Sequence, residues 1–326
     1  MKLSIIIPIF KVEEYISCCL KSIKDQLDED VEVILVNDGT PDNSMQKAFE
    51  VVGNDNHFKV INQENQGLSI ARNNGFLLAS GEFVWFVDSD DWLLNGAITQ
   101  VKRVIAMNEN IDVIASVLLM SYENSHEDIE YKPINGMISG KLYLQKKYRQ
   151  GAIQRFIFKR SFLLRNKLQF RAKILHEDSL YGFKMLYLAK NIYILPNPVY
   201  AYRIRSNGSI MSSISIKTAY DLVEIHKELT TFMNQYVLDV DKKWYRLAIF
   251  NTIECIFGFC RYILGTEEFK CFYKNNKKYL FQESKFLLSN KKTFLYGVKM
   301  CFFPIWNMRI RVIIKKLIAY VNKKNI

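Results

Sequence analysis

The sequence has no glycine-rich phosphate-binding loop after any of its apolar runs. No G-x-G-x-x-G or Walker pattern follows a predicted strand, and the first apolar run leads into Pro8-Ile9-Phe10-Lys11 instead. A dinucleotide-binding Rossmann fold needs small residues at this turn so that the backbone can approach a pyrophosphate. The chain is therefore not predicted to hold phosphates in that way, and other groups must neutralise them.

Cysteine is scarce and is not arranged for metal or disulfide chemistry. None of the six cysteines belongs to a C-x-x-C pair or stands beside a histidine at zinc-ligand spacing. We expect free, buried thiols. The N-terminus enters a predicted strand without the charged and apolar regions of a signal peptide, so we expect the protein to stay in the reducing cytoplasm. The cysteines are Cys18, Cys19, Cys255, Cys260, Cys271 and Cys301.

Long apolar runs are also missing. No uninterrupted stretch reaches the ~18 residues of a membrane span, and the longest candidate, residues 247–264, is broken by Glu254 and Arg261. The length of 326 residues suits a catalytic domain at residues 1–215 followed by a mainly helical region at residues 216–326.

Acidic residues are absent from residues 285–326, and most of the formal net charge of +12 lies there. Apolar residues from Ile310 to Val321 fall on one helical face with lysines and arginines around it, and aromatic residues precede them. This pattern predicts a basic amphipathic helix on an anionic membrane surface. The alternative is a terminal helix packed on the protein body. Nucleic-acid binding is not predicted, because no DNA- or RNA-binding motif accompanies the charge.

The N-terminal region alternates apolar runs with amphipathic segments. Ile16, Leu20, Ile23 and Leu27 recur at helical spacing between two apolar runs that end in polar turns. This alternation predicts an α/β fold, with a mainly parallel sheet flanked by helices. Strands are expected at residues 2–7, 31–36, 58–61 and from 83, and helices at 16–27, 44–52 and 68–79.

An acidic cluster follows the predicted strand that begins at residue 83. Asp88 and Asp90 are two residues apart, so in an extended segment they share a face. They could together hold Mn²⁺ or Mg²⁺, because these hard cations take carboxylates along with phosphate oxygens. The alternative is an acidic turn that opens a helix.

Four segments resemble the family 2 glycosyltransferases in order and spacing: SIIIP at residues 4–8, VNDGT at 36–40, NQGLSIARN at 65–73 and DSDD at 88–91. The resemblance covers about residues 1–210. It implies the GT-A nucleotide-sugar-binding fold and transfer of a sugar with inversion at its anomeric carbon.

The resemblance also implies roles for individual residues. Asp38 would accept hydrogen bonds from uracil, Arg72 would face the nucleotide, Asp88 would lie near the ribose and Asp90 would bind the metal. Asp38 would also suit any tight turn, and Arg72 could be a solvated helix residue. The remaining predicted nucleotide-sugar contacts are Pro8 and Phe10 at the base, Asn65, Ser89, and Arg203 and Ser209 in a segment that would close over the donor.

A second acidic cluster, Glu177 and Asp178, follows His176 in a polar segment. An inverting transfer is a single displacement, so the acceptor hydroxyl must lose a proton as it attacks, and a carboxylate can take it. Family members are similar in having Glu-Asp here, which favours Asp178 as the base and gives Glu177 a positioning or pKa-tuning role. Glu177 is the rival base. The structural alternative is that the cluster caps a helix beginning near Leu180.

These observations predict a metal-assisted inverting glycosyltransferase. We expect it to move a hexose-type sugar from a UDP-sugar to a glycan or lipid-linked glycan of a bacterial surface polysaccharide, such as lipopolysaccharide or capsule. It would be cytoplasmic and peripheral on the inner face of the plasma membrane. The alternatives are a teichoic-acid-type or protein-directed transferase of the same fold, or a domain that binds nucleotide sugar without turnover. No histidine in the closing segment completes a metal site.

Overall fold

The computed structural model describes residues 2–107, 109–122, 125–128, 136–146, 151–205, 215–260, 263 and 265–288. The chain divides into two compact units, residues 1–213 with 224–252 and residues 214–223 with 253–326. The assignment of residues 1–215 to catalysis and of 216–326 to a separate helical region stays a prediction.

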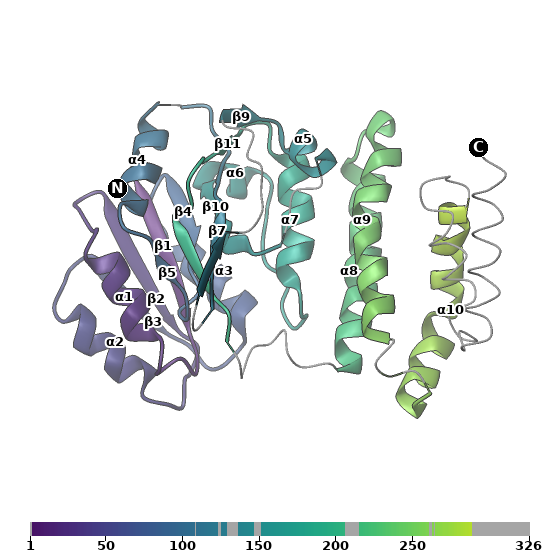
Figure 1. Ribbon diagram of the computed structural model, residues 1–326, viewed down its shortest axis with the longest axis horizontal. Coiled ribbons are helices and arrows are strands. Elements are labelled where there is room, and N and C mark those ends of the chain that lie inside the picture. Colours follow the sequence, from purple (N-terminus) through teal and green to yellow (C-terminus); the bar gives the residue numbers. More distant parts are fainter. Residues whose placement is uncertain are drawn as a thin grey trace. The chain divides into compact units, whose positions relative to one another are not determined.

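The first part of the chain alternates strands and helices as predicted (Figure 1). Each element begins within two residues of its expected start, because apolar periodicity and polar turn residues mark both of its ends. The elements are β1 (Leu3–Ile9), α1 (Ile16–Lys24), β2 (Val31–Asn37), α2 (Ser44–Val52), β3 (Phe58–Asn62), α3 (Leu68–Leu78) and β4 (Phe83–Phe86).

The described strands of the main sheet follow the order β3-β2-β1-β4-β10-β6-β11-β9. The first four are parallel, β10 (Phe156–Lys159) runs antiparallel to both of its neighbours, and β6 (Val113–Ala115) pairs in parallel with β11 (Ile192–Ile194). β9 (Gly136–Ile138) is antiparallel to β11. The predicted class, a mainly parallel sheet flanked by helices, is confirmed.

A smaller sheet has the order β5-β12-β7-β8. Its strands are β5 (Trp92–Leu93), β12 (Tyr200–Arg203), β7 (Leu118–Tyr122) and β8 (Ser125–Asp128). β12 pairs with β5 at Tyr200 and Ala201, which brings the C-terminal end of β12 beside the acidic loop between β4 and β5. The other helices are α4 (Ala97–Met107), α5 (Gly140–Gln145), η1 (Ile153–Arg155), α6 (Arg160–Arg165), α7 (Glu177–Leu188), α8 (Ile216–Tyr236), α9 (Asp239–Cys260) and α10 (Glu267–Leu288).

Helices cover both faces of the parallel half of the sheet. On one face, alternate residues of β1 such as Ile5 and Ile7 pack in one buried cluster with Ile16 and Leu20 of α1. On the other face α3 lies very close, because a Cβ added at Gly75 would stand 2.4 Å from Cγ2 of Ile6. Residues 5, 6 and 7 thus alternate between the two layers, as the period of a strand requires.

Pro8 lies inside β1 and does not close it. The carbonyl of Ile6 accepts from Val87 N on the β4 side, and Pro8 faces that same side two residues later. The pairing of β1 with β4 ends at Ile6, so the missing N–H of Pro8 leaves no ladder hydrogen bond unmade.

The prediction that the cysteines are buried is wrong for three of the five described. All five are free, but Cys18, Cys255 and Cys271 are exposed, and only Cys19 and Cys260 are buried. They lie in helices, where neighbouring positions alternate between buried and solvated faces. Cys301 and the predicted basic amphipathic helix lie outside the described residues. None of the described helices is long and apolar enough to cross a membrane.

Candidate active site

The acidic loop lies at the point where the strand order reverses. From β1 the chain proceeds outward to β2 and β3 and then returns to β4 on the other side of β1. In open α/β sheets ligands bind beyond the carboxyl ends of the strands at such a point. Asp88, Ser89, Asp90 and Asp91 follow β4 directly, and the next helix, α4, begins only at Ala97. The alternative of a turn that opens a helix is therefore wrong.

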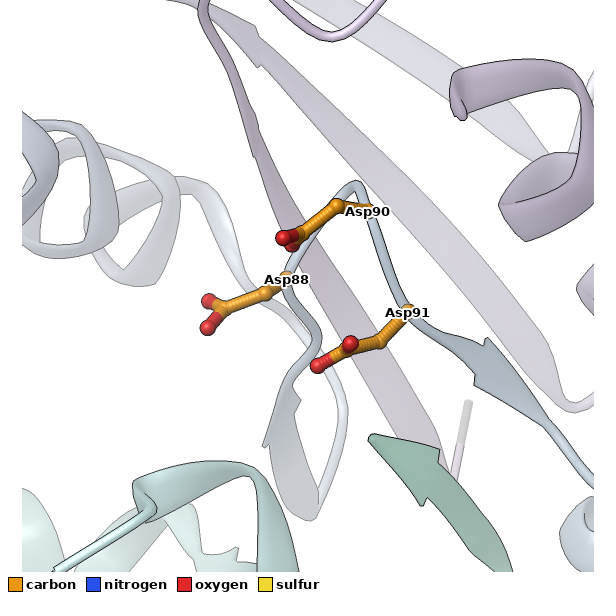
Figure 2. A group of neighbouring side chains, drawn as sticks. All are labelled: Asp88, Asp90 and Asp91. Atoms are coloured by element: carbon orange, nitrogen blue, oxygen red, sulfur yellow. The ribbon is translucent and has the colours of Figure 1, made fainter. Parts of the chain in front are cut away.

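Three carboxylates of this loop converge. Each of Asp88, Asp90 and Asp91 offers an oxygen, and these atoms all lie within 4.8 Å of one another. Figure 2 shows the three side chains directed to the same side of the loop. Ser89, which lies between Asp88 and Asp90 in the sequence, is buried. The donor set consists of hard carboxylate oxygens, so it fits Mg²⁺ or Mn²⁺ chemically, and the metal-ligand roles of Asp88 and Asp90 stay predictions.

Asp88 is held by side chains from three other segments. Its Oδ1 accepts a hydrogen bond from Nη2 of Arg72 at 2.7 Å, and its Oδ2 accepts from Nε2 of Gln154 in η1. Its backbone N–H donates to the hydroxyl of Tyr200. The start of the loop is therefore positioned from α3, η1 and β12 together.

Arg72 joins the two predicted acidic clusters. It is 1% exposed, so the alternative of a solvated helix residue is wrong. Its Nη1 donates to Oε1 of Glu177 at 2.8 Å while Nη2 binds Asp88. The guanidinium also lies over the ring of Phe170, 5.1 Å from its centroid, and that ring stacks on Tyr181 of α7. Burial lowers the pKa of Arg72, but the negative charges of Asp88 and Glu177 outweigh burial and raise the pKa, which keeps the guanidinium charged.

Glu177 and Asp178 form the first turn of α7, three residues earlier than the helix start near Leu180 that the capping alternative assumed. Burial raises the pKa of Glu177, although Arg72 opposes that shift. Asp178 is held by backbone groups instead. Its Oδ2 accepts from the N–H of Ala152 at 2.8 Å and its Oδ1 from the N–H of Ser179 at 2.7 Å. Each oxygen keeps a lone pair for a further partner.

The backbone beside Asp178 is strained at two positions. Ala152, whose N–H binds Asp178, has φ +59°, and His176, which precedes α7, has φ +62°. Side-chain-bearing residues adopt this left-handed conformation at a cost of about 1–3 kcal/mol, and such residues cluster at functional sites. Gly151 lets the backbone come close to Asp178, because a Cβ at this position would lie 3.1 Å from Oδ2 of Asp178.

Asp91 is a buried structural anchor for β12. It is 2% exposed, and its two oxygens accept hydrogen bonds from the Tyr200 hydroxyl at 2.7 Å and from the N–H of Arg203 at 2.8 Å. Burial and the neighbouring Asp90 raise the pKa of Asp91 well above its ordinary value. These contacts fix the end of β12 against the acidic loop.

Two arginines leave β12 toward the loop. Nε of Arg203 donates to the carbonyl of Asp90 at 2.8 Å, and its guanidinium lies 4.6 Å from the ring centroid of Trp92. Arg205 forms an ion pair with the carboxylate of Asp90 and lies 4.4 Å from the ring centroid of Tyr15. The loop is thus enclosed by positive charge on the β12 side. Ser209, predicted as a donor contact, lies outside the described residues.

The carboxylate of Asp38 is buried and accepts three hydrogen bonds from the segment that leads into α3. Its Oδ1 accepts from Nε2 of Gln63 and from the N–H of Gln66, and its Oδ2 accepts from the N–H of Gly67. Asp38 therefore fixes the entry to the helix that carries Arg72. The role of Asp38 toward uracil stays a prediction.

The other predicted base contacts differ in exposure. Pro8 is buried in β1, Phe10 just after it is 37% exposed, and Asn65 is exposed. The partly exposed ring of Phe10, 5.3 Å from Nζ of Lys11, is accessible to a ligand, whereas Pro8 contributes mainly to the sheet. The structure places Pro8 and Phe10 at the end of β1, and their nucleotide roles stay predictions.

Several residues of the site had no signal in the sequence. They carry no acidic or glycine-rich motif. The pairing of β10 and β12 brings the segments of Gln154, Tyr200 and Arg205 to the loop. Tyr15 directly precedes α1, and Trp92 directly follows Asp91. Arg205 was visible as a basic residue beside Arg203 but had no assigned partner. The residues in question are Tyr15, Trp92, Gln154, Tyr200 and Arg205.

This combination of a mainly parallel sheet, helices on both faces and carboxylates at the switch point defines a GT-A glycosyltransferase domain. TarS 1–349 of S. aureus in complex with UDP-GlcNAc has the same fold, with a TM-score of 0.68 and 21% identity over 88% of this chain and 81% of that one. The mannosyltransferase PcManGT of Pyrobaculum calidifontis, in complex with GDP-Man and Mn²⁺, gives a TM-score of 0.54 and 14% identity over 94% of this chain and 88% of that one.

The sequence matches the family Glycosyl transferase family 2 over residues 4–169, and the chain belongs to that family. It is 31% identical to EpsH of Bacillus subtilis over 64% of the chain and 62% of EpsH. It is also 31% identical to the glycosyltransferase GlyA of Streptococcus pneumoniae, over 77% of the chain. The chain spans only 37% of the length of GlyA.

Proposed function

We propose that the protein is a metal-assisted inverting glycosyltransferase that moves a hexose-type sugar from a UDP-sugar to a glycan or lipid-linked glycan. The observation that carries this proposal is the pair of hydrogen bonds from Arg72 to Asp88 and Glu177. It joins the carboxylates assigned to the donor with the turn that carries the assigned base, although these motifs are far apart in sequence.

The chain supplies a base and a set of charges in this arrangement. Asp178 would take the proton of the acceptor hydroxyl as that oxygen attacks the anomeric carbon. Its two backbone hydrogen bonds hold the carboxylate in one orientation before the acceptor arrives. Arg72 keeps Glu177 and Asp88 in place. The hydrogen bonds that Asp178 accepts in the described structure come from backbone N–H groups and not from a cation.

The leaving group of this reaction is a nucleoside diphosphate whose β-phosphate gains negative charge. Arg203 and Arg205 stand on the side of the loop where such charge could be neutralised. Asp90, with Asp88, would hold a divalent cation, Mn²⁺ or Mg²⁺, which supplies Lewis-acid stabilisation of that charge when bound. Asp91 contributes by fixing the loop, since both of its oxygens already accept hydrogen bonds within the fold.

The names of relatives support a surface-glycan acceptor. One, 30% identical over 74% of the chain, is the GalNAc(5)-diNAcBac-PP-undecaprenol beta-1,3-glucosyltransferase of Campylobacter jejuni. Another, 26% identical over 65% of the chain, is the poly(ribitol-phosphate) beta-glucosyltransferase of Bacillus spizizenii, which favours a teichoic-acid-type acceptor as the second candidate. A domain that binds nucleotide sugar without turnover is disfavoured, because Asp88 and Asp90 converge in one group of carboxylates and Asp178 lies in the first turn of α7.

We also propose that the basic segment at residues 285–326 holds the protein at an anionic membrane surface, on the cytoplasmic side where a lipid-linked acceptor is reached. Its charge and its apolar helical face support this proposal. Flotation with liposomes that contain anionic lipid tests it, with neutral liposomes as the control. Equal recovery of the protein with neutral and with anionic liposomes would remove the electrostatic basis of the proposal.

The activity is tested by UDP release from a panel of UDP-sugars, in the presence of Mn²⁺ and with glycan acceptors of both candidate classes. We expect release with at least one donor, loss of release with a chelator, and inverted anomeric configuration in the product by NMR. Retained configuration would exclude the single displacement. No binding of UDP with or without Mn²⁺ would remove the UDP-sugar from the proposal.

A further inference from the structure

The predicted metal ligand Asp90 is already paired with a cation of the chain. Its carboxylate forms an ion pair with Nη2 of Arg205, and the two side chains are 25% and 17% exposed. Asp88 and Asp91 differ from Asp90 in their partners, because each accepts hydrogen bonds from side chains or backbone inside regular elements. Arg205 instead stands two residues beyond the end of β12.

The contacts of Arg205 leave part of its guanidinium unused. Its Nε is buried and has no hydrogen-bond partner among the described residues. The guanidinium carbon lies 4.4 Å from the ring centroid of Tyr15, and this contact with the ring provides no hydrogen-bond acceptor for Nε. Arginine offers five N–H donors in a planar fork that suits the oxygens of a phosphate. The pairing with Asp90 therefore satisfies Arg205 only in part.

The negative charges of the loop also favour a cation beside Asp90. Asp88, Asp90 and Asp91 stand within 4.8 Å of one another, and in the described structure the carboxylate of Asp90 is paired with Arg205. A divalent cation on Asp90 would meet the positive charge of Arg205 at close range, where like charges repel strongly. The cation and Arg205 consequently compete for one carboxylate, and linkage makes that competition reciprocal.

The geometry points to Arg205 as an exchangeable counter-ion: it pairs with Asp90 when no divalent cation is bound, and moves to the diphosphate of the donor when a cation takes Asp90. This inference rests on the proposed function, since it assumes that Asp90 binds the metal. It assigns to Arg205 the coupling of metal binding and donor binding. Tyr15 supports the guanidinium while it is paired with Asp90.

The test measures Mn²⁺ binding to the full chain without nucleotide, by calorimetry and by the EPR signal of free Mn²⁺. We expect Arg205→Gln to bind Mn²⁺ about tenfold more tightly than the wild type, equivalent to about 1.4 kcal/mol. Arg205→Lys keeps the charge, so its Mn²⁺ affinity should stay within about twofold of the wild-type affinity, well below the tenfold gain of Arg205→Gln. Arg165→Gln is the matched control, because this substitution removes the same charge from α6 at a residue whose side chain is 65% exposed.

The second measurement is the affinity for UDP at saturating Mn²⁺. We expect Arg205→Gln to bind UDP at least about fivefold more weakly, a loss near 1 kcal/mol, while Arg165→Gln binds it as the wild type does. Opposite changes in the two affinities are the signature of the exchange. A purely structural role would weaken Mn²⁺ and UDP binding together, and that result would overturn the inference.

Two further outcomes separate this inference from the proposed function. Unchanged Mn²⁺ affinity in Arg205→Gln, with binding lost in Asp90→Asn, would overturn the exchange and leave the metal site in place. Binding of Mn²⁺ to Asp90→Asn as tight as to the wild type would show that Asp90 is not the ligand, which overturns the metal assignment of the proposed function itself.

Discussion

Nη1 of Arg72 lies 2.8 Å from Oε1 of Glu177, although the two residues are 105 positions apart in the chain. The same guanidinium holds Asp88 through Nη2 at 2.7 Å. Helix α3, the loop after β4 and the first turn of α7 therefore share one buried cation. The position of the acidic loop relative to the turn with Asp178 depends on this residue.

Replacing Arg72 with methionine tests that dependence. We expect Arg72→Met to lower the free energy of unfolding by about 3–5 kcal/mol, because it leaves two buried carboxylates without their partner. Methionine keeps most of the apolar contact with Phe170, so the loss reports mainly on charge. Urea denaturation followed by circular dichroism measures the change.

The control for Arg72 is Arg165→Met, which removes an exposed arginine whose distance to Asp112 is 3.6 Å. We expect its free energy of unfolding to stay within about 0.5 kcal/mol of the wild type. If the two variants lose the same stability, the buried pairing does not hold the three segments together.

Glu32 makes folding stability depend on acid pH. It is 1% exposed in β2. Burial raises its pKa, but the hydrogen bonds from Lys59, Ser4 and Ser80 together outweigh burial and lower the pKa to about 2 from 4.5. Because the folded state binds the proton less readily than the unfolded state, this stability is present above pH 4.5 and is lost as pH falls toward 2.

The expected contribution of Glu32 near neutral pH is about 3 kcal/mol, from the size of that pKa difference. Unfolding midpoints in urea, measured at a series of pH values from neutral to acid, follow the loss. Glu32→Gln cannot ionise, so its stability should fall less steeply over the same window. Parallel slopes for the wild type and Glu32→Gln would assign the acid sensitivity to other carboxylates.

The elements predicted from the sequence are those whose ends are marked by residues within or next to the element itself. Polar turn residues after β1, β2 and β4 and the helical spacing in α1 need no partner to be recognised. The insertion of β10 between β4 and β6 could not be predicted in this way, because a short apolar strand carries no information about its neighbours.

The same difference applies to the site. Asp88, Asp90 and Glu177 could be chosen as candidates because each stands in an acidic cluster, and such a cluster can be recognised in a single sequence. Gln154 and Tyr200 reach Asp88 only through strand pairing and backbone turns. The burial of Arg72 was likewise hidden, since a polar residue on a helix shows its solvated or buried state only when its partners are in place.

A pair of identical substitutions tests the packing of α5 on α7. A Cβ at Gly140 would stand 1.8 Å from the carbonyl oxygen of Leu186, and backbone cannot move aside cheaply. We expect Gly140→Ala to lower the free energy of unfolding by at least about 1–3 kcal/mol. Gly258 lies in α9 with nothing within 4 Å of an added Cβ.

Gly258→Ala should therefore raise stability by about 0.5–1 kcal/mol, the difference between glycine and alanine in a helix. Thermal melts of both variants show directly whether each substitution raises or lowers stability. A stabilised Gly140→Ala would mean that α5 does not lie as close to α7 as the structure has it, and the position of Asp178 on α7 would need revision.

The assignment of the base rests on the different partners of Asp178 and Glu177. The carboxylate of Asp178 accepts only backbone N–H groups in the described structure, whereas Glu177 is bound to Arg72. We expect Asp178→Asn to lower turnover by about 100- to 10,000-fold, the range of general-base catalysis, with UDP affinity unchanged. Turnover is measured as UDP release and affinity by calorimetry.

Glu177→Gln should lower turnover less than Asp178→Asn does but should lower stability more, because it weakens the contact with Arg72 while leaving Asp178 able to accept the proton. A larger loss of turnover in Glu177→Gln than in Asp178→Asn, at temperatures where both variants are folded, would transfer the role of the base to Glu177.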